Sequence, residues 1–575
     1  MDATRYRAGL TRPAAEPRDP ADPARGPGRA DRPGAGAGAV GLAGGLVGRL
    51  LVAVIPALLG LATGGYHLGR VPLWRDEAAT KAIASRRVYQ ILATMPHDDA
   101  VHGAYYLIVH YVIRLLGSSN HALRLPSVLA MAVACGFTAL IAERLTAPAG
   151  RLHAACTGVA AGAIFAVLPA TIDYAQEARS YALVTMMATI ATYLLLRALD
   201  DGRRRWWGGY GAAVFLAALV NLFGLLLLVA HGLTVLVRAR PTSVATPAPG
   251  PGGGGGSGWG LAWRRLGVPL GWIAAGVVTV ALLSPLLLVA YGQRTAISWI
   301  PSSASAGREA FTLAHRWAGS ADLVWPVFGL AALGVLGSLV ADRRAPGPAT
   351  AALPWLIAPP AILIGLSAIH PIWNQRYVEF CLPALAICVA AGLSWLWRLA
   401  AIALGPSARG PGAIAWLAFL PAFAAAVALV AILLPADAAI RAPGYQPDNL
   451  ERETAIIAAN AEPGDIVFYI PVNDRIVSMP FPGPWRKLRD IALATSPVAS
   501  DTLYGTDVSP AELVRRFKHV TRVWVISSAM VPESAFLAST APTAIDREEF
   551  RLVAAMHWTH RWRDGDTELT LYLAR

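Results

Sequence analysis

Long apolar stretches separated by short polar connections make up most of this chain. Eleven of them are about 17–25 residues long, the length that an α-helix needs to cross the roughly 30 Å hydrocarbon core of a bilayer. Strands of a membrane β-barrel would be about ten residues long and would alternate in polarity, which this pattern does not. We therefore predict a polytopic α-helical membrane protein with spans at 43–66, 122–143, 153–172, 180–199, 206–222, 223–238, 267–291, 322–340, 351–369, 377–397 and 413–435.

One further apolar stretch, 102–117, is shorter and contains two His, one Arg and several Tyr. We interpret it as a juxtamembrane helix that lies in the membrane interface. The alternative is an ordinary short crossing. That alternative would place the later loops on the wrong sides of the membrane unless another span were also miscounted.

The pattern changes at both ends of the chain and once in the middle. Residues 1–42 are rich in Pro, Ala, Gly and Arg, which predicts a disordered cytoplasmic tail and not a cleavable signal peptide. Residues 241–258 are rich in Pro, Gly and Ser and predict a flexible cytoplasmic linker. Charges and strand-like runs return near the end of the chain, where Asp564-Gly565 predicts a hairpin turn. We expect a membrane domain over 43–435 and a small extracytoplasmic α/β domain over 436–575.

The distribution of charge predicts the orientation of the chain. Lys and Arg number 49 against 36 Asp and Glu, a formal net charge of +13. Under the positive-inside rule, the short loops that hold the basic clusters face the cytoplasm. These clusters are Arg144 with Arg151, 203–205, Arg238 with Arg240, Arg264 with Arg265, and Arg343 with Arg344. Alternate crossings then place the N-terminus inside and the loops near Asp76, Asp173, Arg294 and Arg376 outside, if 102–117 does not cross. The positive charge thus reflects topology, and we predict no nucleic-acid partner.

No cofactor can be read from the residues. All four Cys lie in apolar runs, which offer no disulfide framework and no zinc-ligand spacing. His97, Asp98, Asp99 and His102 are of the types that bind a divalent metal, but their spacing matches no recognised site. A solvated turn is the favoured interpretation, and we predict no metal site while leaving metal dependence open.

Polar groups gather at the predicted outer ends of four spans. They are Asp76 with Glu77; Asp173 with Glu177, Arg179 and Tyr181; Arg294; and Gln375 with Arg376 and Tyr377. Aromatic belts and snorkelling Arg side chains explain any one of them, but four on one side indicate a site. Carboxylates can accept a proton from a hydroxyl, and arginines can bind a phosphate in a bidentate manner. The set suits transfer of a sugar that is carried on a polyprenyl phosphate.

These motifs resemble those of the GT-C glycosyltransferases, and among them those of bacterial family 39, the protein O-mannosyltransferase-like enzymes. The resemblance covers most of 43–435 and rests on Asp76-Glu77, on 123–127 (Leu-Arg-Leu-Pro-Ser), on 174–181 (Tyr-Ala-Gln-Glu-Ala-Arg-Ser-Tyr) and on 375–377 (Gln-Arg-Tyr). It implies a bundle of about eleven to thirteen helices in the bacterial plasma membrane. It also implies a polyprenyl-monophosphate-sugar donor and an inverting single displacement. The sugar would be a hexose, mannose by family likeness, and the acceptor a protein, polysaccharide or glycolipid outside the cytoplasm.

The same resemblance implies roles for individual residues. Asp76 would be the catalytic base, and Glu77 would orient the loop through an Arg. Arg376 would bind the donor phosphate, with Arg179 as the second candidate. The other side chains expected to contact substrate are Tyr377, Gln375, Glu177, Asp173, Tyr181, Arg294 and His102. The alternative for Asp76 and Glu77 is that they cap the helix that follows them.

Two other functions stay open at this point: a transporter or flippase of lipid-linked sugars, and a non-catalytic scaffold for wall assembly. Transporters often consist of two related halves with broken helices at the midplane of the membrane. In this chain the polar residues gather at one face, which favours the transferase.

Overall fold

The structure is a computed structural model that describes residues 35–238, 258–294, 300, 305–341, 347–405, 413–528, 536–537 and 542–575. Every contact discussed here lies within Arg49–Arg575. Most of the predicted N-terminal tail and nearly all of the predicted linker at 241–258 lie outside the described residues.

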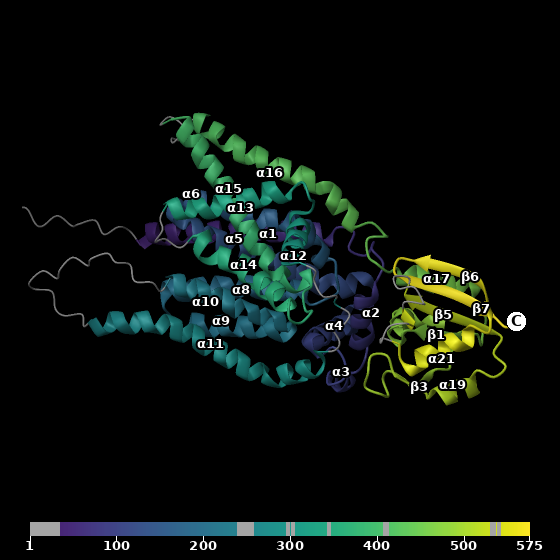
Figure 1. Ribbon diagram of the computed structural model, residues 1–575. Coiled ribbons are helices and arrows are strands. Elements are labelled where there is room, and N and C mark those ends of the chain that lie inside the picture. Colours follow the sequence, from purple (N-terminus) through teal and green to yellow (C-terminus); the bar gives the residue numbers. More distant parts are fainter. Residues whose placement is uncertain are drawn as a thin grey trace, which may run out of the picture. The chain divides into compact units, whose positions relative to one another are not determined.

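Long apolar helices form a bundle in which many neighbours run side by side (Figure 1). They are α1 (Ala35–Gly65), α5 (Asn120–Thr146), α6 (Arg151–Val167), α7 (Pro169–Ala175), α8 (Tyr181–Asp201), α9 (Arg204–Val220), α10 (Leu226–Arg238), α11 (Gly258–Gly292), α13 (Val324–Ala341), α14 (Pro348–Ser367), α15 (Leu382–Ala403) and α16 (Ala413–Ile440). Helix α5 packs against α6 and α8, α8 against α9, and α13 against α15. The predicted helical membrane fold is confirmed.

Each of the eleven predicted spans coincides with a helix or with a broken helix. Within the described ranges, seven helices are long and apolar enough to cross a membrane, and α6 with α7 makes an eighth if the pair counts as one span. These two helices meet at an angle of 64°. The break falls at Leu168, because Pro169 disfavours helical backbone in the residue before it and has no N–H to donate.

Small residues allow α13 and α15 to pack closely. A Cβ at Gly334 would lie 2.2 Å from the carbonyl oxygen of Cys388, and a Cβ at Gly392 would lie 2.0 Å from that of Leu330. Neither position can hold a larger side chain without moving backbone. Such small-residue contacts are typical of helix pairs in membranes, where lipid supplies no hydrophobic drive for association.

Short helices and turns connect the spans. They are α2 (Arg75–Ala84), α3 (Val88–Thr94), η1 (Ala100–His102), α4 (Gly103–Leu116), η2 (Ala147–Ala149), η3 (Leu222–Leu225), α12 (Ala306–Ala318) and η5 (Gln375–Cys381). Helix α4 covers the ambiguous stretch 102–117. Its 14 residues reach about 21 Å, less than the thickness of the hydrocarbon core. The interfacial position of α4 stays a prediction.

The C-terminal residues form a small α/β fold around a five-stranded sheet of order β2-β1-β5-β7-β6. The strands are β1 (Ile466–Ile470), β2 (Arg489–Asp490), β5 (Arg522–Ser528), β6 (His557–Asp564) and β7 (Thr567–Leu573), and β3 (Leu493–Thr495) pairs separately with β4 (Thr506–Asp507). Strand β1 is parallel to β2 and β5, whereas β7 is antiparallel to β5 and β6. The predicted hairpin is present, with Asp564 paired to Thr567.

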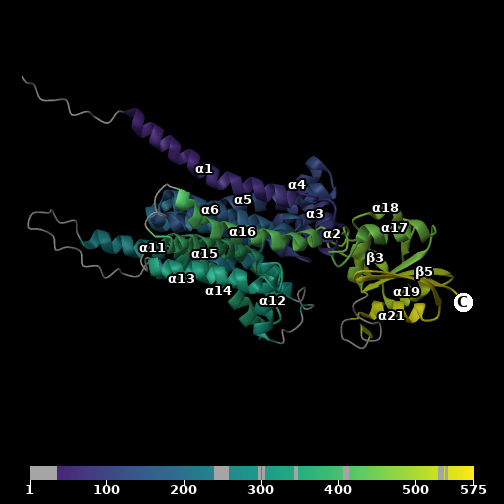
Figure 2. The same cartoon turned by 90° about the horizontal axis from the view of Figure 1, so that it is seen from above.

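Helices cover both faces of this sheet (Figure 2). Helices α17 (Leu450–Asn460) and α18 (Pro482–Trp485) lie on one face, and α19 (Pro510–Arg516) and α21 (Ala544–Val553) on the other. The turn η7 (Val472–Ser478) follows β1. Every residue of β1 is therefore buried, which explains its uninterrupted apolar sequence.

Candidate active site

The acidic pair lies in the first turn of α2, which follows the first span. The N-cap residue, Trp74, makes no side-chain hydrogen bond to the helix. The contacts recorded for the Asp76 and Glu77 carboxylates are with other elements, not with the backbone of α2. Their positions in the first turn suit the helix dipole, but the side chains serve to connect α2 to the bundle.

Glu77 is completely buried and forms a bidentate ion pair with Arg124 of α5. The Nε and Nη2 atoms of Arg124 donate to its two carboxylate oxygens at 2.8 and 2.6 Å, and the backbone N–H of Ala178 donates to Oε1 at 2.8 Å. Arg124 also donates to the carbonyl oxygens of Leu68 and Val71 at 2.9 and 2.8 Å. The pair thus holds the loop before α2, α5 and the turn before α8 in one arrangement.

We expect Glu77→Gln to destabilise the protein by about 3–5 kcal/mol, because it leaves the buried guanidinium of Arg124 without its counter-charge. Thermal unfolding of the purified protein in detergent measures the effect. Glu451→Gln is the control, since Glu451 meets Asn120 at an exposed contact. Equal unfolding temperatures for the two variants would contradict the structural role of the pair.

Asp76 lies beside two arginines that come from distant parts of the sequence. Its Oδ2 is 2.5 Å from Nη1 of Arg376 in η5 and 3.9 Å from Nε of Arg179, which lies just before α8. The Asp76 side chain is 29% exposed, so that a substrate can reach its carboxylate. Asn374 orients Arg376, since its Oδ1 accepts from both the backbone N–H and Nε.

Arg179 also contacts Tyr106 of α4 and Asp99 in the turn between α3 and α4. Its Nη1 donates to the hydroxyl of Tyr106 at 3.3 Å and lies 3.7 Å from Oδ2 of Asp99. Asp99 also accepts from Tyr106 and contacts Nδ1 of His102 at 2.8 Å. Burial alone would raise the pKa of Asp99, but His102 and Arg179 hold it well below its usual range. Asp76, Asp99, Arg179 and Arg376 together are called the Asp76 cluster below.

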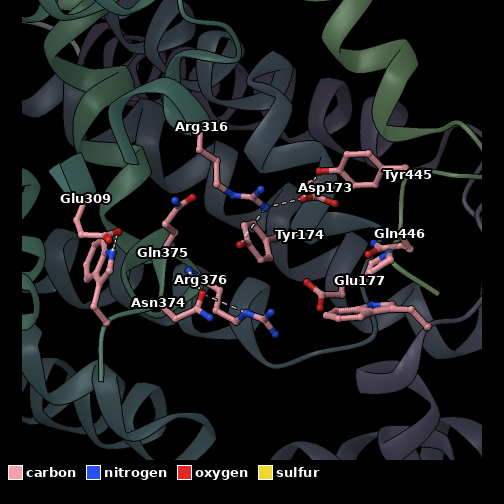
Figure 3. A pocket seen from close by; sticks show the side chains of 13 residues that line it. Asp173, Tyr174, Glu177, Glu309, Arg316, Asn374, Gln375, Arg376, Tyr445 and Gln446 are labelled. Carbon is pink, nitrogen blue, oxygen red and sulfur yellow. Dashed lines mark hydrogen bonds and ion pairs between the residues drawn. The ribbon is translucent and has the colours of Figure 1, made fainter. Parts of the chain in front are cut away.

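A polar cavity of about 450 Å³ opens next to this cluster (Figure 3). The residues that line it are Trp74, Asp173, Tyr174, Glu177, Glu309, Arg316, Trp373, Asn374, Gln375, Arg376, Tyr445, Gln446 and Pro447. Four of the residues predicted from the sequence, Asp173, Glu177, Gln375 and Arg376, are therefore brought together here. Aromatic, amide and carboxyl groups in one cavity suit a polar ligand such as a sugar.

Arg316 of α12 forms a second centre of positive charge in this cavity and was not predicted. Its Nη2 is 2.6 Å from Oδ2 of Asp173 and donates to the hydroxyl of Tyr174 at 3.0 Å. Tyr445 donates to the same carboxylate oxygen at 2.9 Å. The sequence could have indicated α12 by its amphipathic pattern, with Ser305 as N-cap and Glu309 in the first turn. This helix lies between two of the predicted apolar spans.

Glu177 lines the cavity and is buried there. Burial raises the pKa of Glu177 to about 8, and the nearby carboxylates add to this against the opposing charge of Arg376. A protonated carboxyl group can donate a hydrogen bond to a phosphate or hydroxyl oxygen. Its backbone carbonyl accepts from Ser127 at 2.7 Å, which fixes the turn.

The remaining predicted residues lie at different distances from this site. Tyr181 is buried with its ring centroid 5.4 Å from that of Tyr174, and Tyr377 stacks on Phe223 at 4.3 Å. Arg294 is exposed, and its recorded contacts are with Tyr291. Among the described residues, those that line the cavity do not include Arg294.

Among the described residues, no group of three or more His, Cys, Asp or Glu is arranged to hold a metal ion. In the 97–102 turn, Asp98 accepts from the backbone N–H of Leu503 at 2.6 Å, and Asp99 contacts His102 and Tyr106. These acids therefore have protein partners. Asp99 supports Arg179. Nothing in the loop sequence around Asp99 indicated this role.

The comparisons with known proteins agree with this fold. Residues 103–250 match the family model of the dolichyl-phosphate-mannose-protein mannosyltransferases. The structure of ArnT from Cupriavidus metallidurans bound to undecaprenyl phosphate superposes with a TM-score of 0.52 at 18% identity, over 90% of this chain and 97% of that chain. The archaeal oligosaccharyltransferase AglB from Archaeoglobus fulgidus, in complex with an inhibitory peptide and a dolichol-phosphate, gives a TM-score of 0.45 at 11% identity, over 84% and 69%. No curated protein matches the chain in sequence.

By its fold and by the family-model match, the chain is similar to the GT-C membrane glycosyltransferases. The resemblance predicted from the sequence motifs is thereby confirmed. The family model covers about a quarter of the chain, and the structural likeness at 18% identity concerns the fold.

Proposed function

We propose that this protein transfers a hexose, mannose by family likeness, from a polyprenyl-monophosphate donor to an acceptor outside the cytoplasm. The observation that carries the proposal is the meeting of Asp76 and Arg376. These residues are 300 positions apart in the sequence, yet their side chains lie 2.5 Å from each other beside a polar cavity. The structure of ArnT, which has a similar fold, contains bound undecaprenyl phosphate, and this supports a lipid-phosphate ligand.

In the proposed reaction, the phosphate of the donor binds Arg376, with Arg179 beside it. A phosphate that takes Arg376 competes with Asp76 for this guanidinium and releases the Asp76 carboxylate for the acceptor. The acceptor hydroxyl then attacks the anomeric carbon and gives its proton to Asp76. The bond between the anomeric carbon and the phosphate oxygen breaks, and its electron pair leaves on the phosphate, where the arginines stabilise the added charge. A single displacement of this kind inverts the anomeric centre.

The proposal includes a location and a set of partners. The bundle would lie in a bacterial plasma membrane with the N-terminus in the cytoplasm and the C-terminal α/β fold outside. The acceptor would be a protein, a polysaccharide or a glycolipid. The cavity is polar and is lined in part by the loop residues Gln446 and Pro447, which supports an acceptor that arrives from the aqueous side.

Purified protein incubated with radiolabelled polyprenyl-phosphate-mannose and fractionated membrane acceptors tests this function. Label that moves from the lipid to an acceptor fraction supports the transferase and identifies the acceptor. Labelled lipid that changes leaflet in proteoliposomes without loss of its sugar would instead support the flippase. If the assays detect neither sugar transfer nor a change of leaflet, the result favours the non-catalytic scaffold.

We expect the rate of sugar transfer to fall as the pH rises above about 8, because Glu177 then ionises and places a negative charge near the donor phosphate. In Glu177→Gln the side chain stays neutral, so the rate should persist at pH 9. Rates measured from pH 6 to 9.5 test this expectation. Glu309→Gln is the control in the same cavity and should keep the alkaline fall. An unchanged pH profile in Glu177→Gln would rule out Glu177 as its origin.

A further inference from the structure

Arg75, the residue directly before Asp76, contacts the C-terminal α/β fold. Its Nη1 forms an ion pair with Asp474, its Nε is 3.1 Å from Oδ2 of Asp448, and its Nη2 donates to the hydroxyl of Thr567 at 2.9 Å. The Thr567 hydroxyl donates in turn to Asp448 at 3.2 Å. The guanidinium thus joins a closed polar network.

The three partners of Arg75 lie close together only when the C-terminal fold is formed. Asp448 precedes α17, Asp474 lies in η7, and Thr567 begins β7. Their side chains are 2% exposed or less. A buried carboxylate needs a partner, so these acids and Arg75 hold one another firmly. The backbone N–H of Leu450 also donates to the carbonyl oxygen of Leu73, just before α2.

Two further hydrogen bonds join the C-terminal fold to the region around Asp99, on the other side of the Asp76 cluster. The backbone N–H of Leu503 donates to Oδ2 of Asp98 at 2.6 Å, and Arg86 donates to the carbonyl oxygen of Thr502 at 2.8 Å. Asp98 is the neighbour of Asp99, which supports Arg179. The C-terminal fold therefore binds Arg75, the neighbour of Asp76 in the sequence, and Asp98, the neighbour of Asp99.

Helix α2 needs such support. It has only ten residues, and its N-cap Trp74 provides no side-chain hydrogen bond to the free N–H groups of the first turn. Isolated helices of this length are marginal in water. The first turn, which carries Asp76, would fray unless tertiary contacts held it.

We propose that the C-terminal α/β fold is a positioning module for the Asp76 cluster, with Arg75 as the positioning residue for Asp76 and Asp98 as the positioning residue for Asp99 and Arg179. The catalytic consequence rests on the proposed function. The positioning itself does not, since it concerns the order of α2 and of the 94–102 turn.

Hydrogen–deuterium exchange of the full-length protein in nanodiscs tests the positioning directly. In Arg75→Met, which keeps the apolar stem but removes the guanidinium, we expect amide exchange in α2 to become at least about tenfold faster while β1 exchanges as in the wild type. Asn120→Ala is the matched control, because Asn120 also contacts the C-terminal fold, at Glu451, but belongs to α5. Exchange in α2 that stays at the wild-type rate in Arg75→Met overturns the proposal.

A second variant keeps the test decisive if Arg75→Met loosens β1 as well. Asp98→Asn leaves the buried acids around Arg75 paired and removes charge only at the 94–102 turn. Faster exchange confined to that turn supports the proposal, and unchanged exchange there overturns it.

The kinetic readout separates positioning from the chemistry. If the wild type transfers sugar, Arg75→Met should lower kcat by about tenfold or more while the KM for the donor changes less than about twofold, because Arg376 and Arg179 remain in place. An effect on donor KM alone would contradict the positioning of Asp76. If the wild type transfers no sugar, the proposed function fails, while the exchange measurement still decides on the positioning module.

Discussion

Replacement of Asp76 by Asn is expected to lower kcat for sugar transfer by about 10²–10⁴-fold, the usual contribution of a general base. The amide has almost the same shape as the carboxylate but cannot accept the proton of the acceptor hydroxyl. Donor binding should be retained or strengthened, because Asn no longer competes with the phosphate for Arg376, which lies 2.5 Å from Asp76. Single-turnover transfer from a radiolabelled donor, together with donor binding, measures both effects.

Asp200→Asn is the matched control for this experiment. Asp200 is also an Asp paired with arginines, Arg144 and Arg238 at 2.8 Å, and its side-chain exposure of 30% is close to the 29% of Asp76. It lies at the far end of α8, away from the cavity, so transfer should stay within about twofold of the wild type. Turnover near the wild-type rate in Asp76→Asn would remove Asp76 from the reaction.

Replacement of Arg376 by Lys is expected to reduce kcat/KM for the polyprenyl-phosphate donor by about 10–100-fold. Lysine keeps the charge but loses the planar fork that binds two phosphate oxygens at once, and charge-assisted hydrogen bonds contribute roughly 1.5–3 kcal/mol each. It also loses Nε, through which Asn374 orients the guanidinium. Initial rates against donor concentration give the change.

Arg294→Lys serves as the control for the phosphate role. The sequence placed Arg294 and Arg376 in the same group of outer arginines, but the structure leaves Arg294 exposed beside Tyr291. Its donor kinetics should match those of the wild type. Donor kinetics unchanged in Arg376→Lys, or reduced equally in both variants, would argue against a specific phosphate site at Arg376.

The hydrophobic pattern predicted the architecture well because the bilayer and the surrounding water each impose a requirement on single segments of the chain. A bilayer requires about 20 apolar residues for each crossing helix, and this requirement is local in sequence. The eleven predicted ranges accordingly coincide with helices. The terminal hairpin was predictable for a similar reason, since Asp564-Gly565 separates two strand-like runs, and Gly565 has the positive φ of 56° that such a turn requires.

The sequence also indicated that polar groups lie at the ends of several spans, but their partners became known only from the packing of the folded chain. It pairs Glu77 with Arg124 inside the bundle and Asp76 with Arg376 at the cavity, so that two adjacent acids have different environments. It adds Arg316 from a helix that carries no apolar span, and it leaves Arg294 apart.

Local patterns in the chain therefore establish the membrane class, the helices and the chemical types available at the span ends that are predicted to face outside. Which of these groups meet was decided by packing between elements up to 300 residues apart, and no local pattern encodes such a contact. The same holds for Arg75, whose partners Asp448, Asp474 and Thr567 come together only in the folded C-terminal domain. The physical reason is that apolar length acts within one segment, whereas an ion pair needs two segments to be brought within about 4 Å of each other.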